Sequence, residues 1–350
     1  MKVRKEVIGR LPKCYALAPI TYQGAFHFLA ASELPEKCLL FSAEGKLEDV
    51  VWEKPGGVMS MVYVPGTDGE FLAVNRFYSF NDAAEAVITL ASPAREHGWQ
   101  LHTLAELPYV HRIDLIEHRG CRWLIACQLK SGQDHDNDWS YPGKVQAARL
   151  PEDLNAIGPD RPLELRVLKD GLLKNHGYCR AMEGDTPACL VSSESGIYRF
   201  TPPDFPDRPW KTEELCGDPA SEAVLLDLDG DGAEELCTIS PFHGDRVRIY
   251  HRNSSGGFRL AHEHEKSLPF CHAFYGGRLA GRNRLIVGQR AGDRDLLAFS
   301  FDRGSGRYVC EVLDHDAGSA NVMVYRQGGR DILVSANREK DEIALYRLEP

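Results

Sequence analysis

The feature that most constrains the fold is a two-strand unit that recurs along the chain. Its clearest copy is SEAVLLDLDGDGAEELCTISPFHGD at residues 221–245. The runs EAVLL and ELCTIS are rich in residues that favour strands, and the segment between them supplies the Asp and Gly residues of a tight turn. This pattern predicts a β-hairpin.

Looser copies of the unit start near residues 15, 58, 111, 176, 221, 272 and 320, and a third apolar strand usually follows each of them. Four-stranded units repeated at such a spacing are typical of propeller blades. The chain starts with a lone strand and ends after the third strand of a unit. We therefore predict an all-β, seven-bladed propeller over residues 1–350, a single domain in which the N-terminal strand completes the last blade.

Composition limits the partners and the location of the protein. The net charge of -10 argues against a nucleic-acid partner, since phosphates require a basic face. The chain has no apolar run of the length that a membrane helix requires, and its N-terminus lacks the apolar core of a signal peptide. The cysteines are scattered, and Cys127, Cys189 and Cys237 lie in apolar strands, which predicts buried, reduced thiols. We expect a cytoplasmic protein with no membrane partner.

The turn of the clearest unit carries acidic residues at the spacing of a calcium loop. Asp227, Asp229, Asp231 and Glu235 offer hard oxygen ligands, and glycines permit the tight turn. The segment DLDGDGAEE resembles the FG-GAP or VCBS-type repeat, in which DxDGDG lies in the hairpin turn of a propeller blade. That resemblance implies a structural Ca²⁺ ion, and the alternative is a turn whose carboxylates face water.

Antiparallel pairing places the start of each inner strand and the end of the next strand on one face of the ring. The inner-strand starts include three histidines, His111, His176 and His272, together with Asn321. The second-strand ends carry mainly cations and one more histidine: Arg76, Lys130, Glu194, His243, Arg290 and Arg338. We therefore predict a site at one mouth of the central channel, with the acidic turn on the opposite face.

The residue types at this mouth suggest two kinds of chemistry. His111, His176 and His272 could hold a transition metal such as Mn²⁺ or Zn²⁺, or one of them could act as a general base. The surrounding cations would bind a carboxylate or phosphate. The alternative is that these side chains simply hydrogen-bond to water in a polar channel.

The longest connection on this face, residues 131–144, adds aromatic and acidic groups. Trp139 suits stacking on a sugar ring, and Tyr141 could donate a proton, as could Tyr78 in the segment NRFYSFND. We expect His243, Asn321 and the cations Arg76, Lys130, Arg290 and Arg338 to contact the bound molecule.

The blades that open with His resemble seven-bladed propeller sugar lyases and the aldos-2-ulose dehydratase group. This resemblance implies a lyase or dehydratase that acts by β-elimination on a small anionic or oxidised sugar. A base, a cation or metal and an acid are the groups that such a reaction needs. Two alternatives stay open: a non-catalytic binding or scaffold propeller, and a glycoside hydrolase, which requires two facing carboxylates.

Overall fold

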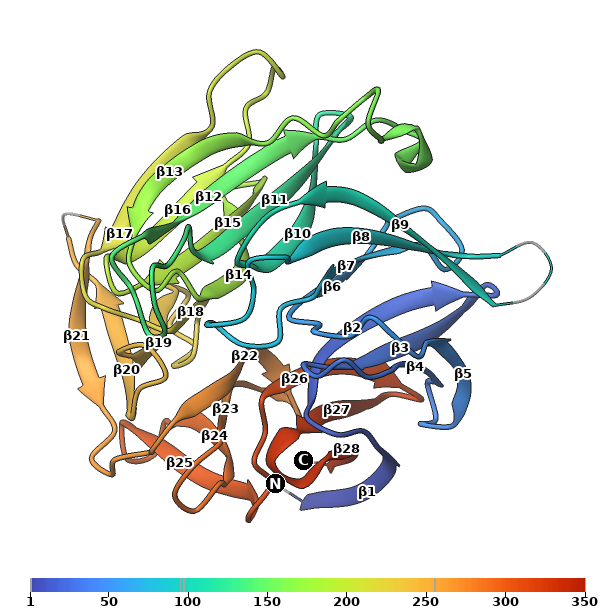
Figure 1. Cartoon of the computed structure of the whole chain (residues 1–350). Coiled ribbons are helices and arrows are strands. Elements are labelled where there is room, and N and C mark those ends of the chain that lie inside the picture. The colour runs from blue at the N-terminus through green and yellow to red at the C-terminus, as the bar shows by residue number, and fades with distance from the viewer. Residues whose placement is uncertain (1, 95, 97, 255, 350) are drawn as a thin grey trace.

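In the computed structural model, the chain forms seven four-stranded antiparallel sheets arranged around a central axis (Figure 1). The structure describes residues 2–94, 96, 98–254 and 256–349. Six sheets consist of four consecutive strands, and the seventh combines the last three strands with the first. This arrangement confirms the predicted all-β, seven-bladed propeller.

The blades are numbered here from the N-terminus. Blade one comprises β2 (Cys14–Tyr22), β3 (Ala25–Ser32), β4 (Cys38–Ser42) and β5 (Leu47–Trp52). Blade two comprises β6 (Met61–Tyr63), β7 (Phe71–Asn75), β8 (Val87–Pro93) and β9 (Trp99–Glu106). Blade three comprises β10 (Val110–His118), β11 (Cys121–Lys130), β12 (Pro142–Arg149) and β13 (Arg166–Leu172). Blade four comprises β14 (Gly177–Glu183), β15 (Thr186–Ser193), β16 (Gly196–Thr201) and β17 (Lys211–Cys216). Blade five comprises β18 (Glu222–Leu226), β19 (Glu235–Ser240), β20 (Arg246–Arg252) and β21 (Phe258–Glu263). Blade six comprises β22 (Cys271–Leu279), β23 (Arg282–Gln289), β24 (Leu296–Asp302) and β25 (Arg307–Asp314). Blade seven comprises β26 (Asn321–Gln327), β27 (Arg330–Asn337), β28 (Glu342–Glu349) and β1 (Lys2–Arg10), and the connections include two 3-10 helices, η1 (Leu154–Ala156) and η2 (Arg338–Lys340).

The two ends of the chain meet in blade seven, where both termini lie in Figure 1. β1 pairs antiparallel with β28, from Lys2 opposite Glu349 to Arg10 opposite Glu342. Because the outer strand of this blade comes from the other end of the chain, backbone hydrogen bonds join the first and last strands of the ring.

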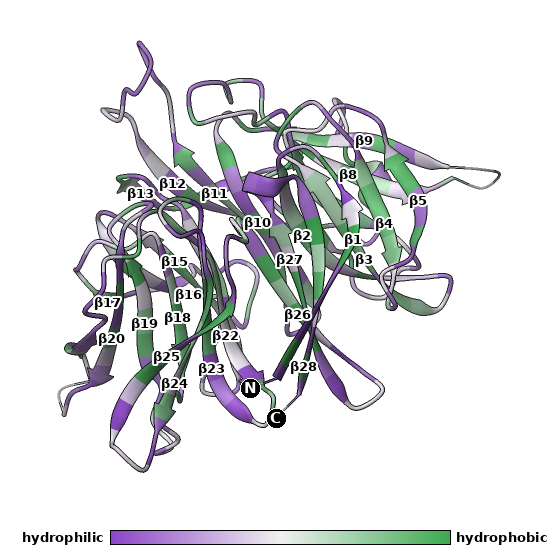
Figure 2. Cartoon of the chain, turned by 90° about the horizontal axis from the view of Figure 1, so that it is seen from below, coloured by the Kyte–Doolittle hydropathy of each residue, from purple (hydrophilic) through white to green (hydrophobic). Residues whose placement is uncertain are grey.

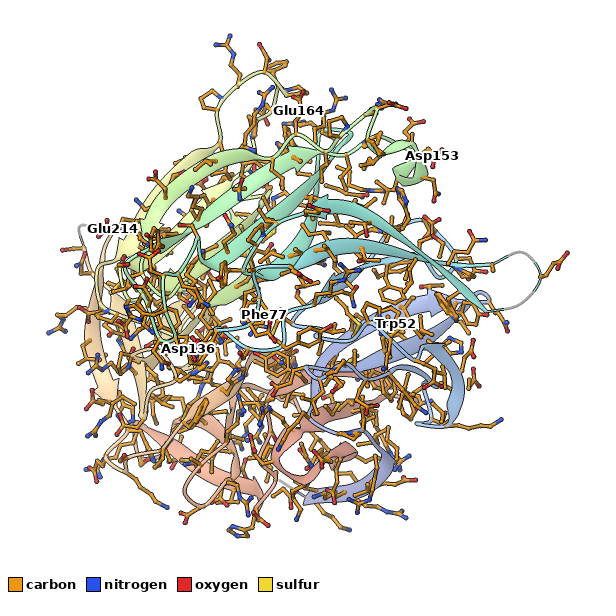
Figure 3. All side chains as sticks on the ribbon, in the orientation of Figure 1. Trp52, Phe77, Asp136, Asp153, Glu164 and Glu214 are labelled. Atoms are coloured by element: carbon orange, nitrogen blue, oxygen red, sulfur yellow. The ribbon has the colours of Figure 1, made fainter. Side chains whose placement is uncertain are left out.

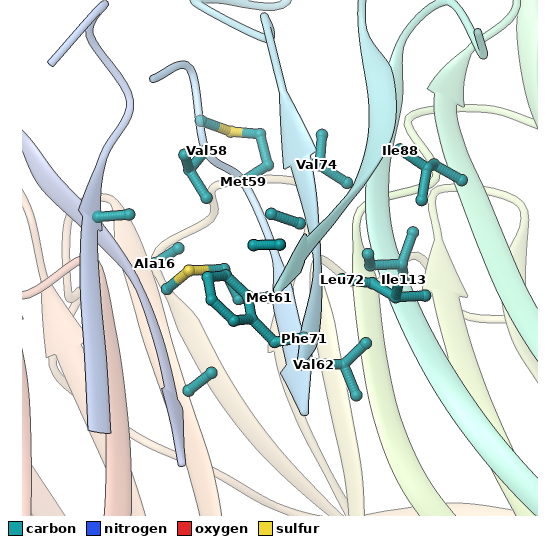
Figure 4. Close-up of a cluster of buried hydrophobic side chains, with 14 of the residues drawn as sticks. Ala16, Val58, Met59, Met61, Val62, Phe71, Leu72, Val74, Ile88 and Ile113 are labelled. Atoms are coloured by element: carbon teal, nitrogen blue, oxygen red, sulfur yellow. The ribbon is translucent and has the colours of Figure 1, made fainter. Parts of the chain in front are cut away.

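The hydrophobic core lies between neighbouring blades. The middle strands are buried on both faces, and β7, for example, is buried along its whole length. The stacked pair Trp52 and Phe71, with ring centroids 5.8 Å apart, joins blades one and two, and Figure 4 shows Phe71 among apolar side chains from adjacent strands. Hydrophobic colouring follows the strands in Figure 2, and much of the hydrophilic colouring lies on loops and edge strands. Because neighbouring blades cover both faces of each middle strand, these strands are continuous apolar runs in the sequence.

The structure also bears on the cysteines and on membrane-spanning helices. All ten cysteines are free thiols, and Cys127, Cys189 and Cys237 are buried in strands, as predicted. Among the described residues, no helix has the length and apolar character needed to cross a membrane.

Candidate histidine site in the central channel

Three inner strands begin with the same local pattern, Leu-Pro-x-x followed by Tyr15, His111 or His272. At each of these rings the pairing with the next strand shifts by one residue, which leaves the aromatic residue unpaired in a β-bulge. The residue two positions earlier has a positive φ in every case: Lys13 48°, Tyr109 58° and Phe270 54°. Because a bulge re-aims a side chain, the three rings from blades one, three and six meet at the axis.

Tyr15 connects two of the predicted histidines. Its hydroxyl lies 3.1 Å from Nε2 of His272 and 3.5 Å from Nε2 of His111. All three side chains are buried. Phe77, labelled near the centre of the ring in Figure 3, packs its ring against His111 at a centroid distance of 5.3 Å.

His176 and His243 complete the cluster. The ring of His176 lies 4.6 Å from that of His111 and 5.1 Å from that of His272, measured between centroids. His243 has a left-handed backbone with φ 48°, and its Nε2 lies 3.3 Å from Nε2 of His176. Its ring is stacked between Phe242 and Phe270, at centroid distances of 3.9 and 4.7 Å.

The set of nitrogens best placed to share a metal ion differs from the predicted set. His176, His243 and His272 each offer a ring nitrogen, and these atoms lie within 4.8 Å of one another. His111 is next to this group but not part of it, and its buried Nδ1 has no hydrogen-bond partner among the described residues. The difference arises because His243 comes from a left-handed turn that inserts its ring between two phenylalanines.

Neighbouring groups define which nitrogen of each ring is free to bind a ligand. Nδ1 of His176 donates to Ser221 O at 3.3 Å and lies 3.0 Å from Oε1 of Glu222. Arg112 donates to the same carboxylate oxygen at 3.1 Å. Nδ1 of His272 donates to Ala320 O at 2.6 Å. Because Nδ1 carries the proton in both rings, Nε2 carries the lone pair.

Three of these histidines, His111, His243 and His272, are uncharged near neutral pH. Burial lowers the pKa of His111, His243 and His272 well below 6.5, and repulsion from neighbouring histidines and from Arg112 or Arg290 lowers it further. A neutral imidazole can bind a metal or accept a proton, so the arrangement suits either a metal site or a general base.

Most of the predicted substrate-binding cations are engaged within the protein. Arg290 and Arg338 both donate to Oε1 of Glu339, at 2.9 and 2.7 Å, and Arg338 also pairs with Glu33. Arg76 is exposed on a backbone with φ 62°. Sequence spacing placed these cations on one face but could not show which carboxylates they pair with.

Lys130, which we predicted to contact a bound molecule, is fully buried. Its amino group donates to Oε1 of Gln133 at 2.6 Å and to Asp138 O at 3.2 Å, and it lies about 5 Å from the rings of Tyr109 and Trp139. Burial lowers its pKa. Lys130 therefore anchors the connection 131–141, between β11 and β12, to the blade.

The predicted aromatic loops lie together at the mouth of the channel where the second strands end, which we call the rim. Trp139 packs on Phe80 at 5.3 Å and on Phe242 at 5.5 Å, measured between ring centroids. Figure 3 labels Asp136 in the same connection. Tyr141 is exposed and donates to Asp134 at 2.9 Å, and Tyr78 donates to Pro55 O at 3.3 Å. Neither tyrosine hydroxyl is bonded to the histidine cluster.

Asn321 lies at the channel, where its amide donates to Tyr15 O at 2.8 Å. Tyr15, Arg112 and Glu222 are the site residues that sequence reasoning did not select. The repeated Leu-Pro-x-x pattern before Tyr15, His111 and His272 is the signal that could have placed Tyr15 in the cluster.

The acidic turn between β18 and β19 divides its predicted ligands into two groups. Asp227, Asp229 and Asp231 have carboxylate oxygens within 4.8 Å of one another, and a second group joins Asp229, Glu235 and His251. Glu235 is buried and accepts from Leu228 N at 2.6 Å. Burial raises the pKa of Glu235 to about 7.

The comparisons with known proteins describe the fold. No protein-family model matches the chain, and no curated protein matches its sequence. The crystal structure of the Myceliophteria thermophila Cps50 (Swd1) β-propeller domain is similar, with a TM-score of 0.61 and 10% identity over 99% of this chain and 100% of that chain. The resemblances to FG-GAP repeats and to propeller sugar lyases receive no support from these comparisons. By fold, the chain is a seven-bladed β-propeller.

Proposed function

We propose that the channel binds a divalent transition metal through Nε2 of His176, His243 and His272. This proposal rests on the distance of 3.3 Å between Nε2 of His176 and Nε2 of His243. Two nitrogens that each lie about 2.0–2.1 Å from a tetrahedral zinc ion are about 3.4 Å apart. The Glu222 and Ala320 oxygens beside Nδ1 are the outer partners that orient metal-binding histidines.

We further propose that this centre serves a carbon–oxygen lyase acting on a small sugar. In a β-elimination, a base removes the proton beside a carbonyl, a carbon–carbon double bond forms, and the leaving oxygen departs with a proton as water or an alcohol. No oxidant is needed. His111, neutral and outside the metal group, is the base in this scheme, and Tyr15, whose hydroxyl lies 3.5 Å from Nε2 of His111, is the acid. The metal would stabilise the enolate oxygen.

Turnover by purified protein tests the lyase role. The metal-loaded protein is incubated with uronates and with neutral keto-sugars, and elimination is followed by the ultraviolet absorbance of the double bond conjugated to the carboxylate or carbonyl. We expect turnover that falls at least 100-fold in His243→Ala and stays at the wild-type rate in His262→Ala, a histidine on β21 outside the cluster. Equal rates in the two variants would refute a catalytic cluster.

A non-catalytic binding propeller is the second candidate, and one observation favours it. Arg112 and Arg290 place positive charge beside His272 and His243, which opposes a divalent cation. Metal-free protein that binds a small molecule without turning it over would support this candidate.

A glycoside hydrolase fits less well. Glu194, the carboxylate expected at the rim, accepts from Lys174 at 3.0 Å, and Glu222 is paired with Arg112. Two carboxylates committed to ion pairs do not form the facing acid and base that hydrolysis needs.

A further inference from the structure

A second feature of the channel is a cavity of about 420 Å³ beside the histidine cluster. All seven inner strands contribute to its lining. The lining residues of β10 and β14 come after the cluster histidines in sequence, and the lining continues to Pro65 in the turn that follows β6. The cavity therefore lies on the hairpin-turn side of the cluster, opposite to the rim that carries Trp139.

This cavity reaches the cluster directly. His272 belongs to its lining, as do Arg112 and Glu222, which contact His176. On the rim side the cluster is covered, because His111 and His176 are at most 3% exposed and His243 is held between two phenylalanine rings. A molecule that reaches the cluster through this cavity does not need to displace those rings.

The charges of the lining identify the class of ligand. Its four charged side chains form two ion pairs, Arg112 with Glu222 at 3.1 Å and Arg180 with Asp114 at 2.6 Å. An anion would have to compete with a carboxylate that already occupies each guanidinium. A neutral molecule can donate to the carboxylates and accept from the guanidinium groups without breaking either pair.

The remaining lining supplies apolar faces beside these polar groups. Tyr63, Tyr178 and Phe274 present aromatic rings, and Asn321 adds an amide. Aromatic rings pack on the C–H faces of a sugar while hydroxyls bond to the polar groups. A volume of about 420 Å³ is within the usual range for small-molecule sites.

We propose that this cavity is a binding site for a neutral, polyhydroxylated molecule of monosaccharide size, which enters from the hairpin-turn face. The site requires no metal, so its occupancy is independent of the lyase role proposed above. If both proposals hold, the bound sugar lies against His272 and the substrate is neutral instead of anionic.

Saturation-transfer difference NMR in EDTA tests this proposal without any turnover. The probes are glucose, galactose and mannose, together with glucuronate, galacturonate and mannuronate. We expect saturation transfer to at least one neutral sugar and a several-fold weaker signal for its uronate. Pro19→Trp, at an exposed residue that lines the cavity, should abolish the signal, and Trp139→Ala at the rim should leave it unchanged.

Phe274→Leu provides a second channel variant in case Pro19→Trp does not fold, and it should weaken the signal several-fold. The proposal is overturned if no neutral sugar binds, if a uronate binds as well as its neutral sugar, or if Trp139→Ala and not the channel variants removes binding. Metal content, measured separately, shows whether the proposed metal centre fails independently.

Discussion

At the scale of single residues, the site depends on one-residue shifts in the pairing of three inner strands. Tyr15, His111 and His272 reach the axis because each occupies a one-residue bulge. The bulges are built from bonds between strands, so hydropathy alone does not show them. His243 arrives by a different route, a left-handed turn, and its equivalent position carries a cation in four other blades and Glu194 in one.

The buried histidines should make the protein sensitive to acid. Because the pKa of His111 is lowered on folding, the unfolded chain binds more protons below pH 6.5, and stability should fall as the pH drops below that value. Each such histidine adds a slope of up to about 1.4 kcal/mol per pH unit. Thermal melting between pH 8 and 5 should show a shallower loss in His111→Gln, and the exposed His135→Gln should follow wild type. Parallel curves for His111→Gln and wild type would count against a buried neutral ring.

We also propose that the acidic turn binds Ca²⁺. The pKa of Glu235 is raised to about 7, and a nearby divalent cation favours the ionised form, so Ca²⁺ must displace a proton below pH 7. Added Ca²⁺ should therefore raise the melting temperature more at pH 8 than at pH 6, and Asp229→Asn should remove the effect. A wild-type melting temperature that ignores Ca²⁺ at pH 8 would mean that the carboxylates only cap the turn.

At the scale of elements, strands were predictable and side-chain partners were not. Apolar runs such as ELCTIS follow from burial on both faces, a local property that the sequence displays. Which cation meets which carboxylate depends on contacts between distant blades. Arg338, for example, pairs with Glu33 across the junction of blades seven and one. The sequence therefore indicated the strand ends that carry these cations but not the carboxylates that they contact.

Lys130 should control the order of the connection 131–141. Lys130→Met keeps the buried chain length but removes the bonds to Gln133 and Asp138 O. An unsatisfied buried carbonyl costs about 1–3 kcal/mol, so we expect a loss of stability in that range. Hydrogen exchange should speed up across residues 131–141 and stay unchanged in β27. Unchanged exchange in the connection would show that the aromatic contacts alone hold it.

At the scale of the whole molecule, the ring is closed by strands from the two ends of the chain. Deletion of residues 2–10 removes β1 and leaves the edge of β28 unpaired. We expect a lower melting temperature and aggregation, because an exposed edge strand pairs with other chains. Substitution of the exposed Val7 by Thr, which keeps the backbone pairing, is the matched control. A truncated protein that remains monomeric at the wild-type melting temperature would contradict closure through β1.

Metal content tests most directly whether the channel histidines hold a transition metal. Protein purified without a metal-affinity step is incubated with Zn²⁺ or Mn²⁺, dialysed and analysed for its metal content. We expect about one bound ion per chain in wild type and in His262→Ala, and several-fold less in His243→Ala, whose replaced ring supplies one of the three nitrogens. Equal metal content in wild type and His243→Ala would show that these histidines do not hold the metal.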